Sequence, residues 1–134
     1  MKIFLKTEDE INLMRKANQL VGLTLAELGK HIKPGVTTLH LDRIAEEFIR
    51  DHGAIPTFKN FPNPYGESFP ASICTSINDV VVHGIPSDND VLDDGDIISI
   101  DCGTLLDGYN GDSCYTFAVG DISCLLYTSP SPRD

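Results

Sequence analysis

The stretch that most constrains the fold is IDCGTLLDGYNGDS, residues 100–113, in which apolar strand-like residues lie on both sides of an Asp-Gly pair. Asp107-Gly108 is a strong signal for a hairpin turn with two residues in the loop. We therefore predict a strand formed by DIISIDCGTLL, a tight turn, and a returning strand formed by YNGDSCYTFAVG.

A turn of this length also predicts which face of the hairpin each side chain occupies. Asp101 should lie opposite Cys114, and Asp112 precedes Cys114 by two residues. Because side chains two residues apart share a face of a strand, Asp101 and Asp112 are expected to be diagonal neighbours on one face. Ile98 and Ile100 should point to the opposite face.

Two carboxylates in such an apolar setting need a partner, because an isolated buried charge is costly and a second like charge raises the cost. A divalent metal could bind between them, lysine or arginine could pair with them, or the two could share a proton. No lysine or arginine occurs between Lys59 and Arg133, so a basic partner would have to come from the N-terminal part. We favour a metal, since carboxylate oxygens suit Mg, Mn, Fe or Zn.

The N-terminal part of the chain predicts two helices. The capping box TEDE begins a helix at Thr7, and KPG at residues 33–35 is expected to end it. A second helix should run from Thr37 or Thr38 to Gly53. Neither helix carries a cluster of reactive residues, so we interpret both as scaffold.

Between the second helix and the hairpin, residues 56–72 are rich in proline and aromatic residues and predict an irregular loop. Residues 73–87, ICTSINDVVVHGIPS, contain two β-branched segments separated by a turn at Asn78-Asp79, and the segment VVV before His83 is expected to be a short strand. His83 follows the second segment and is either a structural residue or, beside a metal, an active-site residue. The order of helices followed by antiparallel strands indicates an α+β fold.

Composition excludes several classes of protein. The net charge of -10 argues against a nucleic-acid partner, which requires a basic face. No apolar run approaches the roughly 20 residues of a membrane-spanning helix, and the N-terminus does not resemble a signal peptide, so we expect a cytoplasmic protein without a membrane partner. The four cysteines include no C-x-x-C pair and are expected to be reduced thiols.

Three segments, SINDVVVHGIP, LDDGDIISIDCG and DGYNGDS, together resemble the type I methionine aminopeptidases in their order and spacing. The resemblance runs from about Lys6 to Ile122 and implies the N-terminal half of the pita-bread fold. In that fold two α+β halves surround a site for two divalent metal ions, which could be Co, Mn, Fe or Zn. The activity implied is hydrolytic removal of the N-terminal methionine of nascent polypeptides, by a protein that we expect to be a monomer.

The same resemblance implies a role for each of five residues. Asp101 would bind one metal ion, and Asp112 would bridge both. His83 would hydrogen-bond the substrate in the transition state. Phe69 and Cys74 would line the pocket for the methionine side chain, whose thioether suits a soft, apolar surface.

The chain departs from the family in its metal ligands. Family members supply a further histidine and two glutamates from the second half, but no His follows His83 here and no Glu follows Glu67. We therefore expect residues 1–123 to form the N-terminal portion of the catalytic domain, with half of the metal site missing and no activity by itself. A non-catalytic pita-bread binding module and a proline-specific pita-bread peptidase are the alternatives.

The last residues, CLLYTSPSPRD at positions 124–134, bear no relation to the family. They resemble the in-frame translation of a sequencing-library adaptor, so we expect a non-native tail with few contacts to the domain. A natural linker rich in serine and proline is the alternative interpretation.

Overall fold

The computed structural model describes residues 3–64 and 66–124. Two helices precede four strands along the chain, and all strand pairs are antiparallel. This is the α+β order that the sequence predicted. The elements are α1 (Glu8–Gly29), α2 (Thr38–Asp51), β1 (Ile55–Pro56), β2 (Ile73–Ile77), β3 (Ile97–Leu106) and β4 (Tyr109–Ala118).

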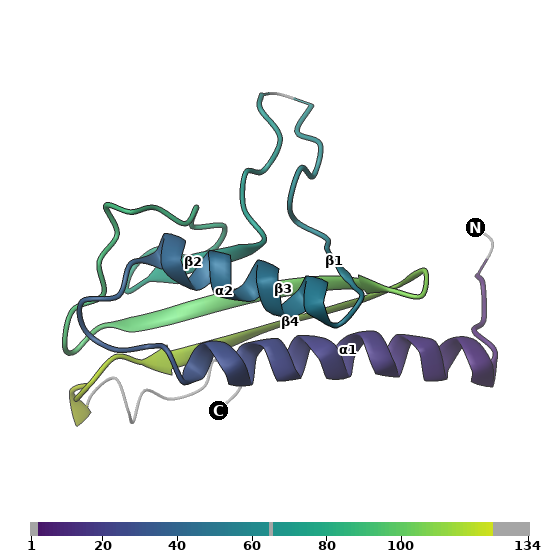
Figure 1. Ribbon diagram of the computed structural model, residues 1–134, viewed down its shortest axis with the longest axis horizontal. Coiled ribbons are helices and arrows are strands. Elements are labelled where there is room, and N and C mark those ends of the chain that lie inside the picture. Colours follow the sequence, from purple (N-terminus) through teal and green to yellow (C-terminus); the bar gives the residue numbers. More distant parts are fainter. Residues whose placement is uncertain (1–2, 65, 125–134) are drawn as a thin grey trace.

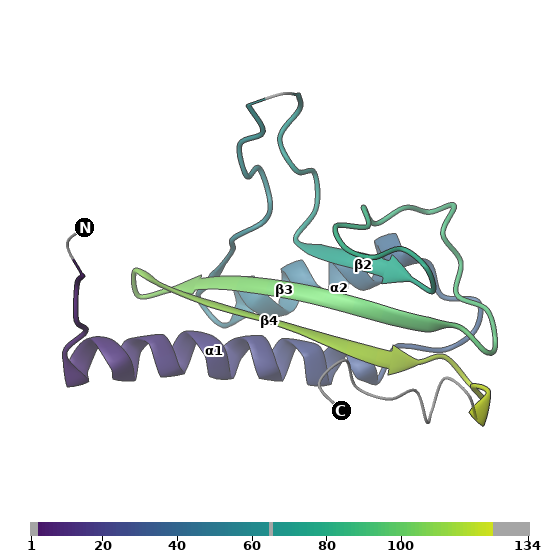
Figure 2. The ribbon, with the colours of Figure 1, turned by 180° about the vertical axis from the view of Figure 1, so that it is seen from behind.

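Strand β3 is the centre of the sheet (Figures 1 and 2). It pairs with β4 along its whole length, and residues 98–102 of the same strand also pair with β2, while Thr104 and Leu105 also pair with the short β1. Side chains of β3 alternate between the two faces of this sheet. Because β3 is the central strand, its even- and odd-numbered side chains define the middle of the two opposite faces of the sheet.

The turn between β3 and β4 has the predicted length. Leu106 pairs with Tyr109, and the two residues between them, Asp107 and Gly108, have φ values of 50° and 81°. Positive φ at both central positions is typical of a type I′ turn, whose twist matches that of the flanking strands. The Asp-Gly pair thus fixes the register of the hairpin.

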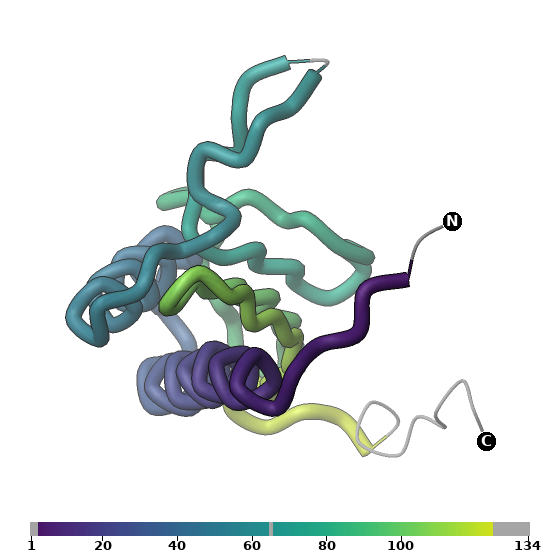
Figure 3. Tube along the Cα trace, turned by 90° about the vertical axis from the view of Figure 1, so that its right-hand side faces the viewer, coloured from purple at the N-terminus to yellow at the C-terminus, as the bar shows by residue number. Residues whose placement is uncertain are grey.

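The two helices cover one face of the sheet (Figure 3). Ile98, Ile100 and Cys102 of β3 are fully buried on this face and belong to one apolar core with residues of both helices. The hydroxyl of Thr104 continues the same row and donates to the carbonyl of Ala17 on α1 at 3.0 Å. The opposite face is left to the odd-numbered residues of β3.

The helix boundaries agree with the sequence at three of their four ends. Thr7 and Thr37 are the N-caps, and Thr7 forms the predicted capping box with Glu10. Gly53, directly after the C-cap of α2, has a φ of 74°, which glycine adopts without strain.

Helix α1 ends earlier than predicted, at Gly29 rather than near residues 33–35. Glycine is a poor helix former, and the next N–H groups, those of Lys30 and His31, bond to carbonyls three residues back. The last turn therefore tightens and the helix stops there.

The segment Val80–Val82 is not a strand, contrary to the expectation from its β-branched residues. Its side chains are exposed, Val81 to 87%. The chain turns away at Asn78, where φ is 51°, and returns to β2 only at Gly84, whose carbonyl accepts from the N–H of Thr75 at 2.9 Å. One backbone hydrogen bond is not enough to pair this segment with β2 as a strand.

Among the described residues, Cys74, Cys102 and Cys114 form no disulfide. No helix of the described part is long and apolar enough to cross a membrane. The predicted tail comprises residues 124–134, of which all but Cys124 lie outside the described residues, and it stays a prediction.

Two glycines give opposite predictions for stability. A Cβ at Gly111 of β4 would lie 2.5 Å from the backbone carbon of Ala17, so Gly111→Ala should lower the free energy of unfolding by about 1–3 kcal/mol. A Cβ at Gly22, exposed in α1, meets no atom within 4 Å, so Gly22→Ala should raise it by about 1 kcal/mol. Urea denaturation measures both, and equal effects of the two changes would contradict the close packing of β4 on α1.

Candidate active site

The two aspartates lie where the hairpin register puts them. Asp101 pairs with Cys114 across β3 and β4, and Asp112 pairs with Gly103, two residues further along β3. Both side chains therefore project from the face opposite the helices, as diagonal neighbours, and both line one cavity of about 540 Å³. The predicted placement of Asp101 and Asp112 as diagonal neighbours on one face of the hairpin is confirmed.

The electrostatics of the pair shows that the two carboxyl groups interact. Burial raises the pKa of the half-buried Asp101, the charge of Asp112 raises it further, and a side-chain hydrogen bond between the two acts in the same direction. The nearby His83 lowers this pKa. Among residues 3–64 and 66–124, no lysine or arginine forms an ion pair with either aspartate.

A divalent cation fits this donor set in part. Two carboxylates that repel each other on one face, without a basic partner in the described chain, are the kind of oxygen ligands that such an ion uses. However, the described residues contain no group of three or more His, Cys, Asp or Glu side chains arranged to hold a metal ion. Asp101 and Asp112 can thus supply one side of a metal site and not the whole of it.

His83 lines the same cavity, from a loop rather than from the end of a strand. Its φ of 59° lies in the left-handed region, which is strained for a histidine. The next residue explains how it is held: a Cβ on Gly84 would lie 1.9 Å from the carbonyl oxygen of Thr75 on β2. Glycine at position 84 lets the loop press against β2 and brings His83 to the aspartates.

The remaining wall of the cavity is apolar. Phe69 and Cys74, which the sequence assigned to a pocket, both line it, and Phe58, Phe61 and Ile85 line it as well. Burial raises the pKa of the Cys74 thiol to about 11, with Asp101 adding to the effect, so this side chain is a neutral, soft surface at pH 7. One cavity thus combines the two carboxylates, a histidine and an apolar wall.

Sequence reasoning did not identify Phe58, Phe61 and Ile85 as site residues. The density of aromatic residues in the loop was the available signal, but their approach to the sheet depends on Gly103. A Cβ on Gly103 would lie 2.3 Å from Thr57 Oγ1 and 2.8 Å from Phe58 Cε1. The absence of a side chain there lets the first part of the loop cross β3 close to Asp112.

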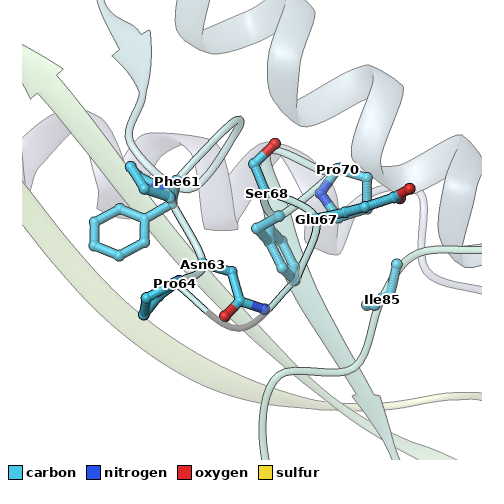
Figure 4. Close-up of a pocket in the computed structure, with 9 residues that line it drawn as sticks. Phe61, Asn63, Pro64, Glu67, Ser68, Pro70 and Ile85 are labelled. Carbon is cyan, nitrogen blue, oxygen red and sulfur yellow. The ribbon is translucent and has the colours of Figure 1, made fainter.

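A second cavity of about 420 Å³ adjoins the first and is formed mainly by the loop itself (Figure 4). Asn63 and Pro64 lie on one side of it, with Pro70 and Ile85 on the other. Phe61, Phe69 and Ile85 line both cavities, so the loop separates them. The aspartates and His83 belong to the first cavity alone.

Comparison with known proteins places this arrangement in a family. Residues 12–128 match the model of metallopeptidase family M24. The chain is 58% identical over 121 residues to a methionine aminopeptidase of Clostridium acetobutylicum, covering 90% of this chain and 46% of that protein. It therefore spans about half the length of the curated relatives that it matches.

Solved structures agree with this result. The fold resembles the crystal structure of methionine aminopeptidase from Rickettsia prowazekii, with a TM-score of 0.86 and 43% identity over 94% of this chain and 48% of that one. It also resembles the Xaa-Pro dipeptidase from Bacillus anthracis, with a TM-score of 0.73, 25% identity, and coverage of 92% and 32%.

The fold is accordingly the pita-bread fold, of which the chain covers about half, as the sequence predicted. The hairpin with its two aspartates, the histidine loop and the apolar wall all lie within the matched residues. The chain belongs to metallopeptidase family M24.

Proposed function

We propose that the complete protein to which this chain corresponds hydrolyses the peptide bond after an N-terminal methionine of nascent polypeptides. The observation that carries the proposal is the single cavity in which Asp101, Asp112 and His83 lie against an apolar wall. The 58% identity to a methionine aminopeptidase supports this substrate over the proline-specific one, since the dipeptidase likeness stands at 25%.

In this proposal the apolar wall binds the methionine side chain. Phe58, Phe69 and Cys74 contribute aromatic rings and a neutral thiol to the cavity. Contacts between sulfur and aromatic rings are favourable for a thioether, and an unbranched side chain fits an irregular apolar space. The peptide bond that follows would then lie toward the two aspartates.

Asp101 would hold one divalent metal ion, and Asp112, its diagonal neighbour, would bridge two. Co, Mn, Fe and Zn are the candidates. The ions would supply Lewis-acid chemistry, activating water and polarising the scissile carbonyl. Further ligands would come from outside the residues described, because those residues offer only one side of the site.

His83 would donate a hydrogen bond to the substrate as charge develops in the transition state. Its loop position lets the ring reach into the cavity from the side of β2, and Gly84 fixes that position. A donor that acts mainly on the transition state changes kcat rather than metal affinity.

The presence of His83 and of both aspartates argues against a non-catalytic binding module. We place the protein in the cytoplasm, where nascent chains emerge, and expect a monomer that needs no nucleic acid.

The first prediction concerns metal binding in a protein made by joining residues 1–123 to the remainder of the Clostridium acetobutylicum relative. Asp101→Asn and Asp112→Asn should each weaken Mn²⁺ binding, measured by calorimetry, by more than about tenfold, since even outer-shell changes cost about 10- to 100-fold. Asp107→Asn is the matched control, because it removes a carboxylate from the same hairpin and Asn-Gly keeps the type I′ turn. Equal affinities in all three variants would contradict the ligand assignment.

The second prediction is that the 134-residue chain alone does not release methionine from a Met-Ala-Ser peptide in the presence of Mn²⁺ or Co²⁺, whereas the joined protein does. A catalytic metal commonly needs about three protein ligands and an open position. The two aspartates do not meet this number. Methionine release by the short chain at a rate close to that of the joined protein would refute the proposal that the site is completed from elsewhere.

The third prediction concerns the histidine in the joined protein. His83→Ala should lower kcat by about 100-fold or more, as removal of a transition-state donor does, with Mn²⁺ affinity unchanged. His40→Ala, at an exposed position on α2, should leave both quantities as they are. Loss of bound metal in His83→Ala would point to a ligand role, and full activity would return His83 to a structural role.

A further inference from the structure

The loop of residues 57–72 rises from the sheet on two legs (Figure 1). Within its described part no residue belongs to a helix or strand. Its own base is closed by the N–H of Asn60, which donates to the carbonyl of Phe69 at 2.8 Å, and by the N–H of Phe69, which donates to Phe61 at 3.1 Å. These bonds join the legs to each other, and the N–H of Thr57, which donates to the carbonyl of Gly103 at 3.1 Å, ties only the start of the first leg to β3.

The second leg is fixed by a buried carboxylate on α2. Asp42 is only 5% exposed, and its Oδ1 accepts from the backbone N–H groups of Ser72 at 2.7 Å and Ile73 at 3.0 Å. Burial raises the pKa of Asp42, and these two hydrogen bonds lower it. Because a buried carboxylate is costly without such partners, the end of the loop is tied firmly to this helix.

The first leg is fixed by a second carboxylate on the same helix, one turn further on. The ammonium group of Lys59 donates to Oε2 of Glu46, and the Lys59 side chain is only 31% exposed. Arg50 binds the other oxygen, Oε1, with its Nε at 3.0 Å. Asp42 and Glu46 are four residues apart, so they lie on one face of α2 and each holds one leg.

These legs carry the apolar wall of the cavity. Phe58 directly precedes Lys59 in the first leg, Phe69 belongs to the second leg, and Cys74 follows Ile73 in β2. A shift of either leg would therefore change the width of the space that faces Asp101, and it would leave the aspartates in place because these belong to the paired strands β3 and β4.

We propose that Asp42 and Glu46 are positioning residues that set the shape of the side-chain pocket by holding the two legs of loop 57–72. The proposal assigns to α2 a part in substrate binding, although neither carboxylate lines the cavity. It rests on the proposed function for the identity of the ligand, a methionine side chain, but the contacts to the legs are independent of that function.

The first test measures amide hydrogen exchange in the 134-residue chain and needs no activity. Asp42→Ala should speed exchange at Ser72 and Ile73 by at least about tenfold, the equivalent of about 1.4 kcal/mol. Asp42→Asn keeps an oxygen at the same place and should retain most of the protection. In case Asp42→Ala does not fold, Lys59→Met, at a partly exposed position, should speed exchange at Asn60 and Phe61.

The second test measures kinetics on a Met-Ala-Ser peptide in the joined protein. Lys59→Met and Glu46→Gln should each raise KM by about fivefold, which corresponds to about 1 kcal/mol, with kcat changed by less than about twofold. The KM of the double variant should be no higher than that of either single variant, because both substitutions remove the same contact between Lys59 and Glu46. Lys59→Arg keeps the positive charge, so its KM should stay close to that of the unsubstituted joined protein.

Arg50→Met is the matched control, since Arg50 pairs with the same Glu46 carboxylate and does not belong to the loop. It should leave loop exchange and KM unchanged. Unaltered exchange in Asp42→Ala and Lys59→Met would overturn the proposal, and so would faster exchange with an unchanged KM in an active joined protein. If the joined protein releases no methionine at all, the proposed function fails, and the exchange result still decides whether the carboxylates hold the loop.

Discussion

The register between β3 and β4 is the constraint on which the rest of the site depends. A type I′ turn at Asp107-Gly108 pairs Leu106 with Tyr109, and every later pair follows from that one. A slip of one residue would send one aspartate into the helix-covered core, where its desolvation would be costly. A two-residue turn that does not itself line the cavity thus decides whether the two carboxylates lie on one face.

The second requirement is that loops approach the sheet closely enough to complete the cavity. Two glycines allow it: Gly103 leaves room for the first leg of loop 57–72, and Gly84 lets the histidine loop touch the backbone of β2. Helix α2 binds loop 57–72 through the carboxylates of Asp42 and Glu46. The sheet supplies the polar groups and the loops supply the apolar wall, so neither part makes the site by itself.

The sequence predicted the features that rest on local signals, namely the capping box at Thr7, the Asp-Gly turn, and the shared face of Asp101 and Asp112. It missed features that depend on contacts between distant residues. The apolar composition of Val80–Val82 favoured a strand, but β3 already occupies one edge of β2 and the chain returns only at Gly84. Asp42 looked like an ordinary helix residue, because its partners lie about thirty residues away in the loop.

The central claim is that Asp101 and Asp112 share a metal site that the rest of the complete protein finishes. The most direct measurement is a crystal structure of the joined protein grown with Mn²⁺, with data collected for the anomalous signal of manganese. We predict anomalous density in contact with both carboxylates, on the face opposite the helices, with His83 facing it across the cavity. Density elsewhere in the protein, with none beside Asp101 and Asp112, would contradict the claim.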